Sequence, residues 1–266
     1  MAKSYKQEMD MKFAKGHGME IPNLDEMRTI FPDAADLLLP SRVYEFLEGK
    51  MRKYADYAKI ETQPNGEKLV PIKASSYLVS KQIGEDMRPI TGEDVFVREQ
   101  VLERLLAASN MLGKVASDSR LEVVYGYRAL SIQTALFERI KRELLSGGFN
   151  GSNAELLEAV HRIVAVPDVA GHPTGGAVDI QIIKDGQLLN MGTPIWVFVE
   201  DSYTFSPYIG IDAWANRQLL RDVMVEAEFV PFDGEWWHYS YGDVEWAAAV
   251  QAPYAIYDQI EFRSSQ

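Results

Sequence analysis

GHPTGGAVDIQIIK, residues 171–184, is the part of this chain with the clearest structural signal. Its second half alternates between aliphatic residues and smaller or polar ones. Because alternate residues of a strand share a face, the pattern predicts a strand with Val178, Ile180 and Ile182 toward the core. Asp179 then faces the other way, into a cleft.

Asp179 is expected near the middle of that strand, where β propensity disfavours aspartate. A carboxylate placed there needs a partner, and a metal ion is a suitable one. The preceding pair Gly175-Gly176 permits a tight turn that brings His172 back over the strand. The alternative interpretation is a solvated Asp on an exposed face and an unrelated loop His.

A second segment, EWWHY at residues 235–239, supplies another imidazole and another carboxylate. His172, Asp179 and His238 together make two His and one acidic group, which is the ligand set of a catalytic zinc with one open position. Glu235 is the candidate general base that takes a proton from the zinc-activated water and later gives it to the leaving amine.

The spacing of the second segment imposes a condition. Glu and His three residues apart lie on opposite faces of a regular strand. A shared site therefore needs a turn or bulge at Gly234-Glu235, which the Phe232-Asp233-Gly234 sequence permits. Otherwise the two tryptophans between Glu235 and His238 are simply core residues.

A third segment, VVYGYRAL at residues 123–130, places Arg128 between a predicted strand end and a predicted helix start. Side chains at such junctions often reach into a cleft. A fixed guanidinium there can hold a substrate carboxylate or stabilise an oxyanion. The alternative is a surface Arg paired with a nearby acid.

Composition limits the class of protein. The net charge of -12 argues against nucleic acid or an anionic membrane as a partner, since phosphate binding needs clustered Lys and Arg. The chain has no Cys, which excludes disulfides and thiolate metal sites. A polar, Lys-rich N-terminus without an apolar core predicts no signal peptide and a cytoplasmic location. The oligomeric state stays open.

Helices and short strands are mixed without a βαβ repeat, which predicts an α+β fold with a central antiparallel or mixed sheet flanked by helices. A boundary near residue 90 is expected, between an N-terminal extension, 1–90, and a catalytic domain, 91–266. The expected elements are helical stretches within 24–58, a hairpin over 59–79, helices over 95–117, 130–145, 153–164 and 216–227, strands over 121–125, 176–184 and 235–241, and a last helix capped by Asp243.

Taken together, His-x-x-Gly-x-Ala-x-Asp, Glu-x-Trp-His and an upstream Gly-Tyr-Arg resemble the D-alanyl-D-alanine dipeptidases, zinc D,D-peptidases related to the D,D-carboxypeptidases. The resemblance runs from about Val95 to Trp246. It implies a zinc D,D-peptidase-like fold, zinc on His172, Asp179 and His238, Glu235 as general base and Arg128 as transition-state stabiliser. The matching residues are His172, Gly175, Ala177, Asp179, Glu235, Trp237, His238, Gly126, Tyr127, Arg128 and the segment Met191-Gly192-Thr193.

Two positions depart from the dipeptidase pattern. Ala170 stands where the dipeptidases usually carry Ser, near the substrate carboxylate, and Trp196 stands where they tend to carry the Asp that meets the substrate amine. A Trp can offer a cation–π face but no salt bridge.

The resemblance predicts hydrolysis of D-Ala-D-Ala or a related peptidoglycan-derived dipeptide. One alternative is a D,D- or L,D-carboxypeptidase that acts on longer muropeptides, to which Trp196 points. The other is a non-catalytic peptidoglycan-binding module, which would have no need of a general base at Glu235.

Overall fold

The computed structural model describes residues 5–15, 21, 23–37 and 39–263. Its backbone contacts divide the chain into two units. The first comprises 1–52, 189–221 and 232–236, and the second comprises 53–188, 222–231 and 237–266. A boundary near residue 90 stays a prediction; in the structure, residues 53–188 fall within one unit.

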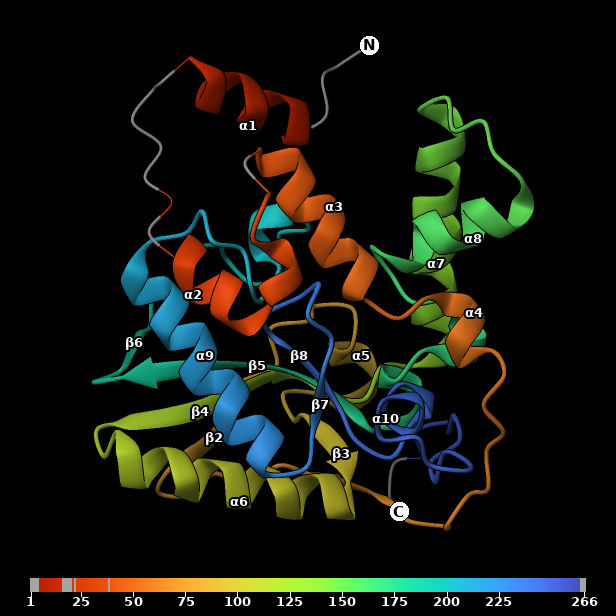
Figure 1. Cartoon of the computed structure of the whole chain (residues 1–266). Helices are drawn as coiled ribbons and strands as arrows, with labels where there is room; N and C mark the ends of the chain where they lie inside the picture. Colours follow the sequence, from red (N-terminus) through yellow and green to blue (C-terminus); the bar gives the residue numbers. More distant parts are fainter. Residues whose placement is uncertain (1–4, 16–20, 22, 38, 264–266) are drawn as a thin grey trace. The chain divides into compact units, whose positions relative to one another are not determined.

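The second unit contains a six-stranded mixed sheet, drawn across the lower part of Figure 1. β2 and β4 are parallel and the other neighbouring pairs are antiparallel, which confirms the predicted α+β fold with a mixed sheet and flanking helices. In spatial order its strands are β2 (Leu78–Ser80), β4 (Ser119–Tyr125), β5 (Ala177–Lys184), β8 (His238–Ser240) and β7 (Val230–Pro231), with β6 (Gln187–Leu188) paired to β5.

β5 is the central strand, and it coincides with the predicted strand over 176–184. The turn after it, at Asp185-Gly186, has both residues at positive φ, 51° and 77°. Residues 177–182 are buried on both faces of the sheet. Asp179 is 2% exposed, so the face of β5 that carries it is also covered, and its place in a cleft stays a prediction.

Helices cover this sheet and contact one another in the second unit. α6 packs against β2, β3 and β4 and buries Val101, Leu105, Ala108 and Leu112, and α7 packs against α8. Their bounds are α4 (Tyr54–Tyr57), α5 (Arg88–Thr91), α6 (Glu99–Val115), α7 (Leu130–Ser146), α8 (Asn153–His161) and α10 (Val244–Val250), with 3-10 turns η2 (Pro167–Val169) and η3 (His172–Thr174). Asp243 caps α10 as predicted, since its side chain accepts a hydrogen bond from Trp246 N.

The predicted hairpin over 59–79 is wrong. β1 (Leu69–Pro71) pairs antiparallel with β3 (Phe96–Arg98), while Thr62 makes an isolated bridge to Ala255. The helix predicted from residue 95 consequently begins at Glu99. Gly66 does adopt a turn conformation, with φ 78°, but the short runs on its two sides find their partners elsewhere in the chain.

The first unit is largely helical around an aromatic core. Tyr44 and Phe205 lie in this core, and the buried Arg217 donates to the carbonyls of Met191, Asp201 and Tyr203. Its elements are α1 (Tyr5–Ala14), α2 (Leu24–Ile30), η1 (Pro32–Ala34), α3 (Pro40–Lys50) and η4 (Glu200–Ser202), and α9 (Ile211–Glu226) runs from this unit into the second.

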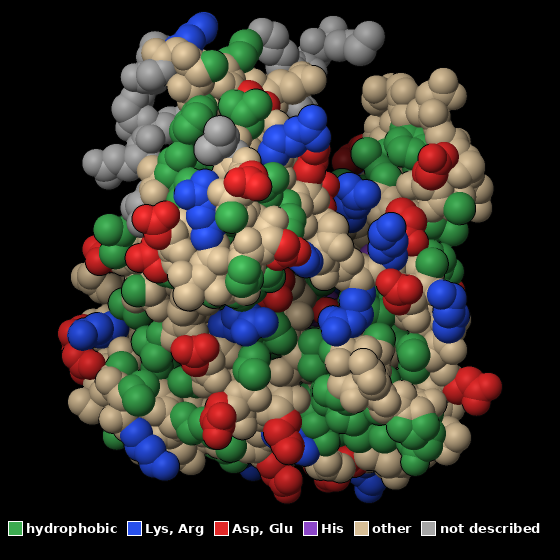
Figure 2. Space-filling model, viewed as in Figure 1, with side chains coloured by type: hydrophobic (Ala, Val, Ile, Leu, Met, Phe, Trp, Pro, Cys, Tyr) green, Lys and Arg blue, Asp and Glu red, His purple; other side chains and the backbone are tan. Residues whose placement is uncertain are grey.

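No helix among the described residues is both long and apolar enough to cross a membrane. On the face drawn in Figure 2, Lys and Arg side chains are interspersed with Asp and Glu. The described residues on that face form no continuous basic surface.

Candidate metal centre

His172 is turned back over β5 by the glycine that follows η3. Gly175 has φ 74°, a left-handed conformation that favours glycine, and its N–H donates to the His172 carbonyl at 3.0 Å. Arg98 and the C-terminal segment fix this turn from two sides: Arg98 Nε donates to Thr174 O at 2.6 Å, and Ile260 N donates to Pro173 O at 3.0 Å. The tight turn expected from the sequence is present.

The register of the sheet places the other two predicted ligands side by side. Asp179 on β5 pairs with His238 on β8 and, on its other side, with Tyr125 on β4. Asp179 Oδ1 lies 3.1 Å from His238 Nδ1 and 3.4 Å from His172 Nε2. One ligand atom from each of the three residues lies within 4.8 Å of the others. The structure therefore brings together the three residues that the sequence predicts as metal ligands.

The hydrogen bonding of His172 shows that this centre suits a cation. Its Nδ1 lies 2.7 Å from the Gly126 carbonyl, which can only accept, so Nδ1 carries the proton. Burial lowers the pKa of His172 to about 4, which keeps the ring neutral near pH 7. Nε2 then directs a lone pair at the Asp179 carboxylate. Two buried acceptors that face each other need a positive charge between them, and two His with one carboxylate are a zinc ligand set.

Asp179 supplies the negative charge of the centre. Burial raises the pKa of its carboxyl, whereas a proton on either imidazole that faces it, His172 or His238, lowers the pKa, and the net direction is below the usual range. The carboxylate is therefore ionised at neutral pH and available to a divalent cation.

Arg128 lies beside the centre, between the end of β4 and the start of α7, as expected. Its backbone N–H donates to the His172 carbonyl at 3.1 Å, and its guanidinium lies 4.6 Å from the centre of the Tyr125 ring. Nη1 donates to Gln133 Oε1 at 2.8 Å. The buried Nε has no hydrogen-bond partner among the described residues.

Glu235 belongs to the first unit, unlike the three predicted ligands. The turn required by its spacing from His238 is present, since Glu235 N donates to Phe232 O at 2.9 Å. Along the chain, Glu235 precedes His238 by three residues. Trp196 also lies in the first unit, with φ 62°, whereas the buried Ala170 lies in the second.

Three partners of the site residues were missed from the sequence: the Gly126 carbonyl, Gln133 and Glu245. Glu245 Oε2 lies 3.7 Å from His238 Nε2, on the side of the ring away from Asp179. Glu245 follows the capping Asp243 by two residues, but no motif marks it as part of a site.

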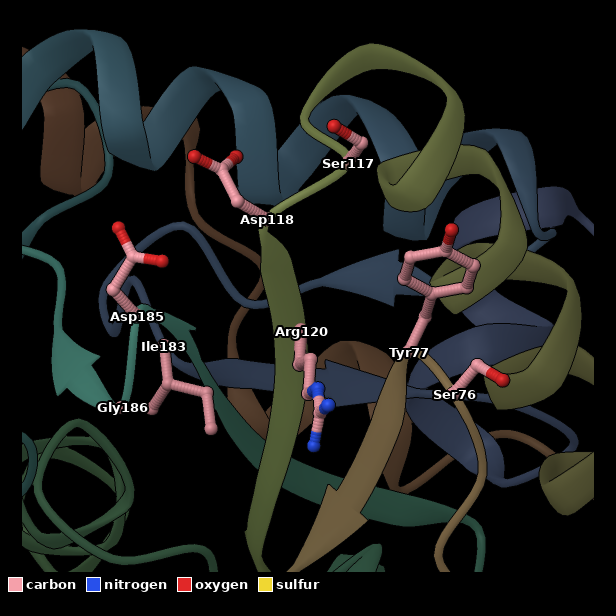
Figure 3. A pocket seen from close by; sticks show the side chains of 8 residues that line it. All are labelled: Ser76, Tyr77, Ser117, Asp118, Arg120, Ile183, Asp185 and Gly186. Atoms are coloured by element: carbon pink, nitrogen blue, oxygen red, sulfur yellow. The ribbon is translucent and has the colours of Figure 1, made fainter.

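A separate hollow of about 580 Å³ lies where β2 and β4 begin and β5 ends (Figure 3). Tyr77, Arg120 and Ile183 line it, and Asp118 at its edge pairs with Lys184 at 3.0 Å. None of the three predicted metal ligands lines this hollow, so it is distinct from the centre described above.

Comparison with known proteins places the chain beside one group of enzymes. A family model described as D-ala-D-ala dipeptidase matches residues 152–260, which include all three predicted ligands. A D-alanyl-D-alanine dipeptidase of Synechocystis sp. is 29% identical over 222 residues, 72% of this chain and 88% of that protein. The Escherichia coli D-alanyl-D-alanine dipeptidase is 32% identical over 78 residues, 29% of this chain and 40% of that protein.

Two solved structures are also similar. A mutant of the vancomycin-resistance D,D-pentapeptidase VanY, solved in complex with Zn(II), shares 20% identity at a TM-score of 0.36, covering 68% of this chain and 86% of its own. The LD-carboxypeptidase LdcB shares 22% identity at a TM-score of 0.40, covering 72% and 78%.

Proposed function

This chain is a zinc metallopeptidase related to the D-alanyl-D-alanine dipeptidases, and from that premise we propose that it hydrolyses D-alanyl-D-alanine or a closely related peptidoglycan-derived dipeptide. The observation that carries the proposal is the convergence of His172, Asp179 and His238 within 4.8 Å, inside the part of the chain that matches the family.

His172, Asp179 and His238 would hold zinc, and the atoms that face one another there are His172 Nε2, Asp179 Oδ1 and His238 Nδ1. Zinc bound there supplies Lewis acidity toward a water molecule and the scissile carbonyl. The burial of His172 and Asp179 excludes bulk water from two of the three ligands and strengthens the electrostatic interactions between them.

Glu235 acts as the general base in this proposal. Its carboxylate takes a proton from the attacking water, whose oxygen adds to the carbonyl carbon of the peptide. The C–N bond then breaks, and the leaving amine receives the proton from Glu235. The proposal is supported by the turn at Glu235 and by the short length of chain to His238.

Arg128 stabilises negative charge on the substrate. Its guanidinium is held by Gln133 and by the face of Tyr125. Because the backbone of Arg128 is bonded to the carbonyl of His172, the cation keeps a fixed position relative to that ligand.

The decisive experiment is Glu235→Gln, with zinc content and hydrolysis of D-Ala-D-Ala measured on the same sample. We expect zinc to be retained and kcat to fall about 10²- to 10⁴-fold, since the general base is lost. Glu26→Gln, an exposed change of the same kind in the first unit, is the matched control and keeps full activity. Full activity in Glu235→Gln would exclude its role, and a zinc-bound parent protein that binds D-Ala-D-Ala without hydrolysing it would indicate a binding module.

A second candidate, a D,D- or L,D-carboxypeptidase on longer muropeptides, is favoured by Trp196. This residue stands where the dipeptidases tend to carry the acid for a free substrate amine. Rates on D-Ala-D-Ala and on its N-acylated form separate the two functions: a dipeptidase prefers the free amine, and a carboxypeptidase prefers the acylated peptide.

A further inference from the structure

We propose that Glu245 is a positioning residue for the metal centre, which holds the ring of His238 in the one orientation that presents Nδ1 to zinc. The inference rests on the proposed zinc site but concerns a residue outside the ligand set. It follows from the contacts at the two ring nitrogens of His238.

The N-terminal cap of α10 positions Glu245 next to His238. β8 ends at Ser240, and the chain then reaches Asp243, which is fully buried and accepts from Trp246 N at 2.9 Å. The cap fixes the first turn of α10, where Glu245 lies. Its side chain is 13% exposed, as is that of His238, so the two groups face each other in a largely dry space.

The two nitrogens of His238 face two different carboxylates. Nδ1 lies 3.1 Å from Asp179 Oδ1, and Nε2 lies 3.7 Å from Glu245 Oε2. Turning the ring over would replace both nitrogens with carbon atoms and remove both of these contacts. When Nδ1 gives its lone pair to a metal, the ring proton resides on Nε2, on the side of Glu245. A carboxylate beyond that proton favours this tautomer and makes Nδ1 a stronger ligand.

The other histidine is oriented by a different kind of group. The outer nitrogen of His172, Nδ1, lies 2.7 Å from the backbone carbonyl of Gly126. Both imidazoles thus direct one nitrogen at Asp179 and the other at an oxygen atom. The oxygen beside His172 is a neutral backbone carbonyl, and the one beside His238 belongs to a carboxylate side chain. A substitution of Glu245 therefore removes the partner of His238 and leaves the partner of His172 in place.

The test measures zinc affinity by competition with a chromophoric chelator in Glu245→Ala and Glu245→Gln. Loss of an outer partner of a metal-bound His typically weakens metal binding about 10- to 100-fold, and we expect a loss of that size in Glu245→Ala. Glu245→Gln keeps an acceptor oxygen and should recover part of the affinity. Glu103→Gln, an exposed change in α6, should bind zinc as the parent does.

A second readout separates positioning from general damage to the fold. With Co²⁺ in place of zinc, the visible absorption band should shift in Glu245→Ala, because the ligand field at His238 changes, whereas urea unfolding of the metal-free protein should change little. Zinc affinity within about twofold of the parent in both Glu245 variants would overturn the inference while leaving the zinc site intact. A parent protein that binds no zinc would overturn the proposed function itself. If the Ala variant does not fold, the isosteric Gln variant decides the question alone.

Discussion

Arg128 is oriented by a short chain of hydrogen bonds that ends on the backbone. Gln133, 1% exposed on α7, donates through Nε2 to Ala165 O at 2.7 Å. That bond fixes which end of the amide faces Arg128, so Oε1 accepts from the guanidinium at 2.8 Å. The cation is therefore held by a side chain whose own orientation is determined by the fold.

We expect Gln133→Leu to lower kcat for dipeptide hydrolysis about tenfold, because a hydrogen bond to a charged group contributes roughly 1.5–3 kcal/mol. KM should change less if Arg128 acts on the transition state, and zinc content should equal that of the parent. The exposed Gln187→Leu serves as the control. Unchanged kcat and KM in Gln133→Leu would show that Arg128 needs no such support.

Site residues that belong to a recognisable motif could be predicted from the sequence, and those without a motif could not. His172, Asp179, His238 and Arg128 belong to short motifs whose spacing suits metal or anion chemistry. Gln133 could not be predicted, since a polar residue on a helix is usually solvent-exposed and only the packing of α7 buries this one.

The turn that carries His172 depends on a glycine. Gly175 has φ 74°, and a Cβ built on it would overlap Leu69 Cδ2. Gly186, at φ 77° in the turn after β5, has nothing within 4 Å of such a Cβ. The two glycines share a backbone conformation and differ in their surroundings.

We expect Gly175→Ala to destabilise the metal-free protein by about 2–4 kcal/mol, combining the cost of a left-handed backbone with that of the steric overlap. Gly186→Ala should cost about 1 kcal/mol, from the backbone alone. Gly175→Ala should also weaken zinc binding, because η3 carries His172. Urea unfolding and a zinc titration measure both effects, and equal losses of stability in the two variants would contradict the packing argument.

Elements with a local signal were predicted well. β5 and α7 were found near their true bounds, because alternation and an amphipathic pattern lie within the segment itself. β1 pairs with β3, and these two three-residue strands come from separate parts of the chain. The sequence of neither strand indicates which strand it pairs with. Asn65-Gly66 is a common turn sequence between two β-type runs, and it therefore favours a local hairpin over the distant pairing.

The stability of the whole protein depends on pH because the fold buries histidines. His161 is 8% exposed, lies against the rings of Tyr54 and Tyr57, and accepts from Val166 N at 3.3 Å. Burial lowers the pKa of His161 to about 4, although Glu158 and Asp168 oppose that shift. The folded state therefore favours the neutral ring.

The sign of the effect follows from this lowered pKa. An unfolded His takes up a proton near pH 6.5, so its contribution to stability is complete above that pH and is lost as pH falls toward about 4. We expect His161 to contribute about 2 kcal/mol to the stability lost by the metal-free protein between about pH 7 and 5. Urea unfolding of His161→Gln should show a correspondingly smaller loss, and an identical loss would contradict the assignment.

The hydrogen bonds that fix the His172 turn also bear on how the protein is made. Ile260 bonds to Pro173, next to the first ligand, and Tyr127 donates through its hydroxyl to Ile260 O at 2.8 Å. A growing chain emerges from the ribosome with His172 and Asp179 well before residue 260. His238 and residue 260 follow later. Metal capture is thus expected only after residue 260 has emerged, when the nascent chain first holds the three predicted ligands and the segment that secures the turn of His172.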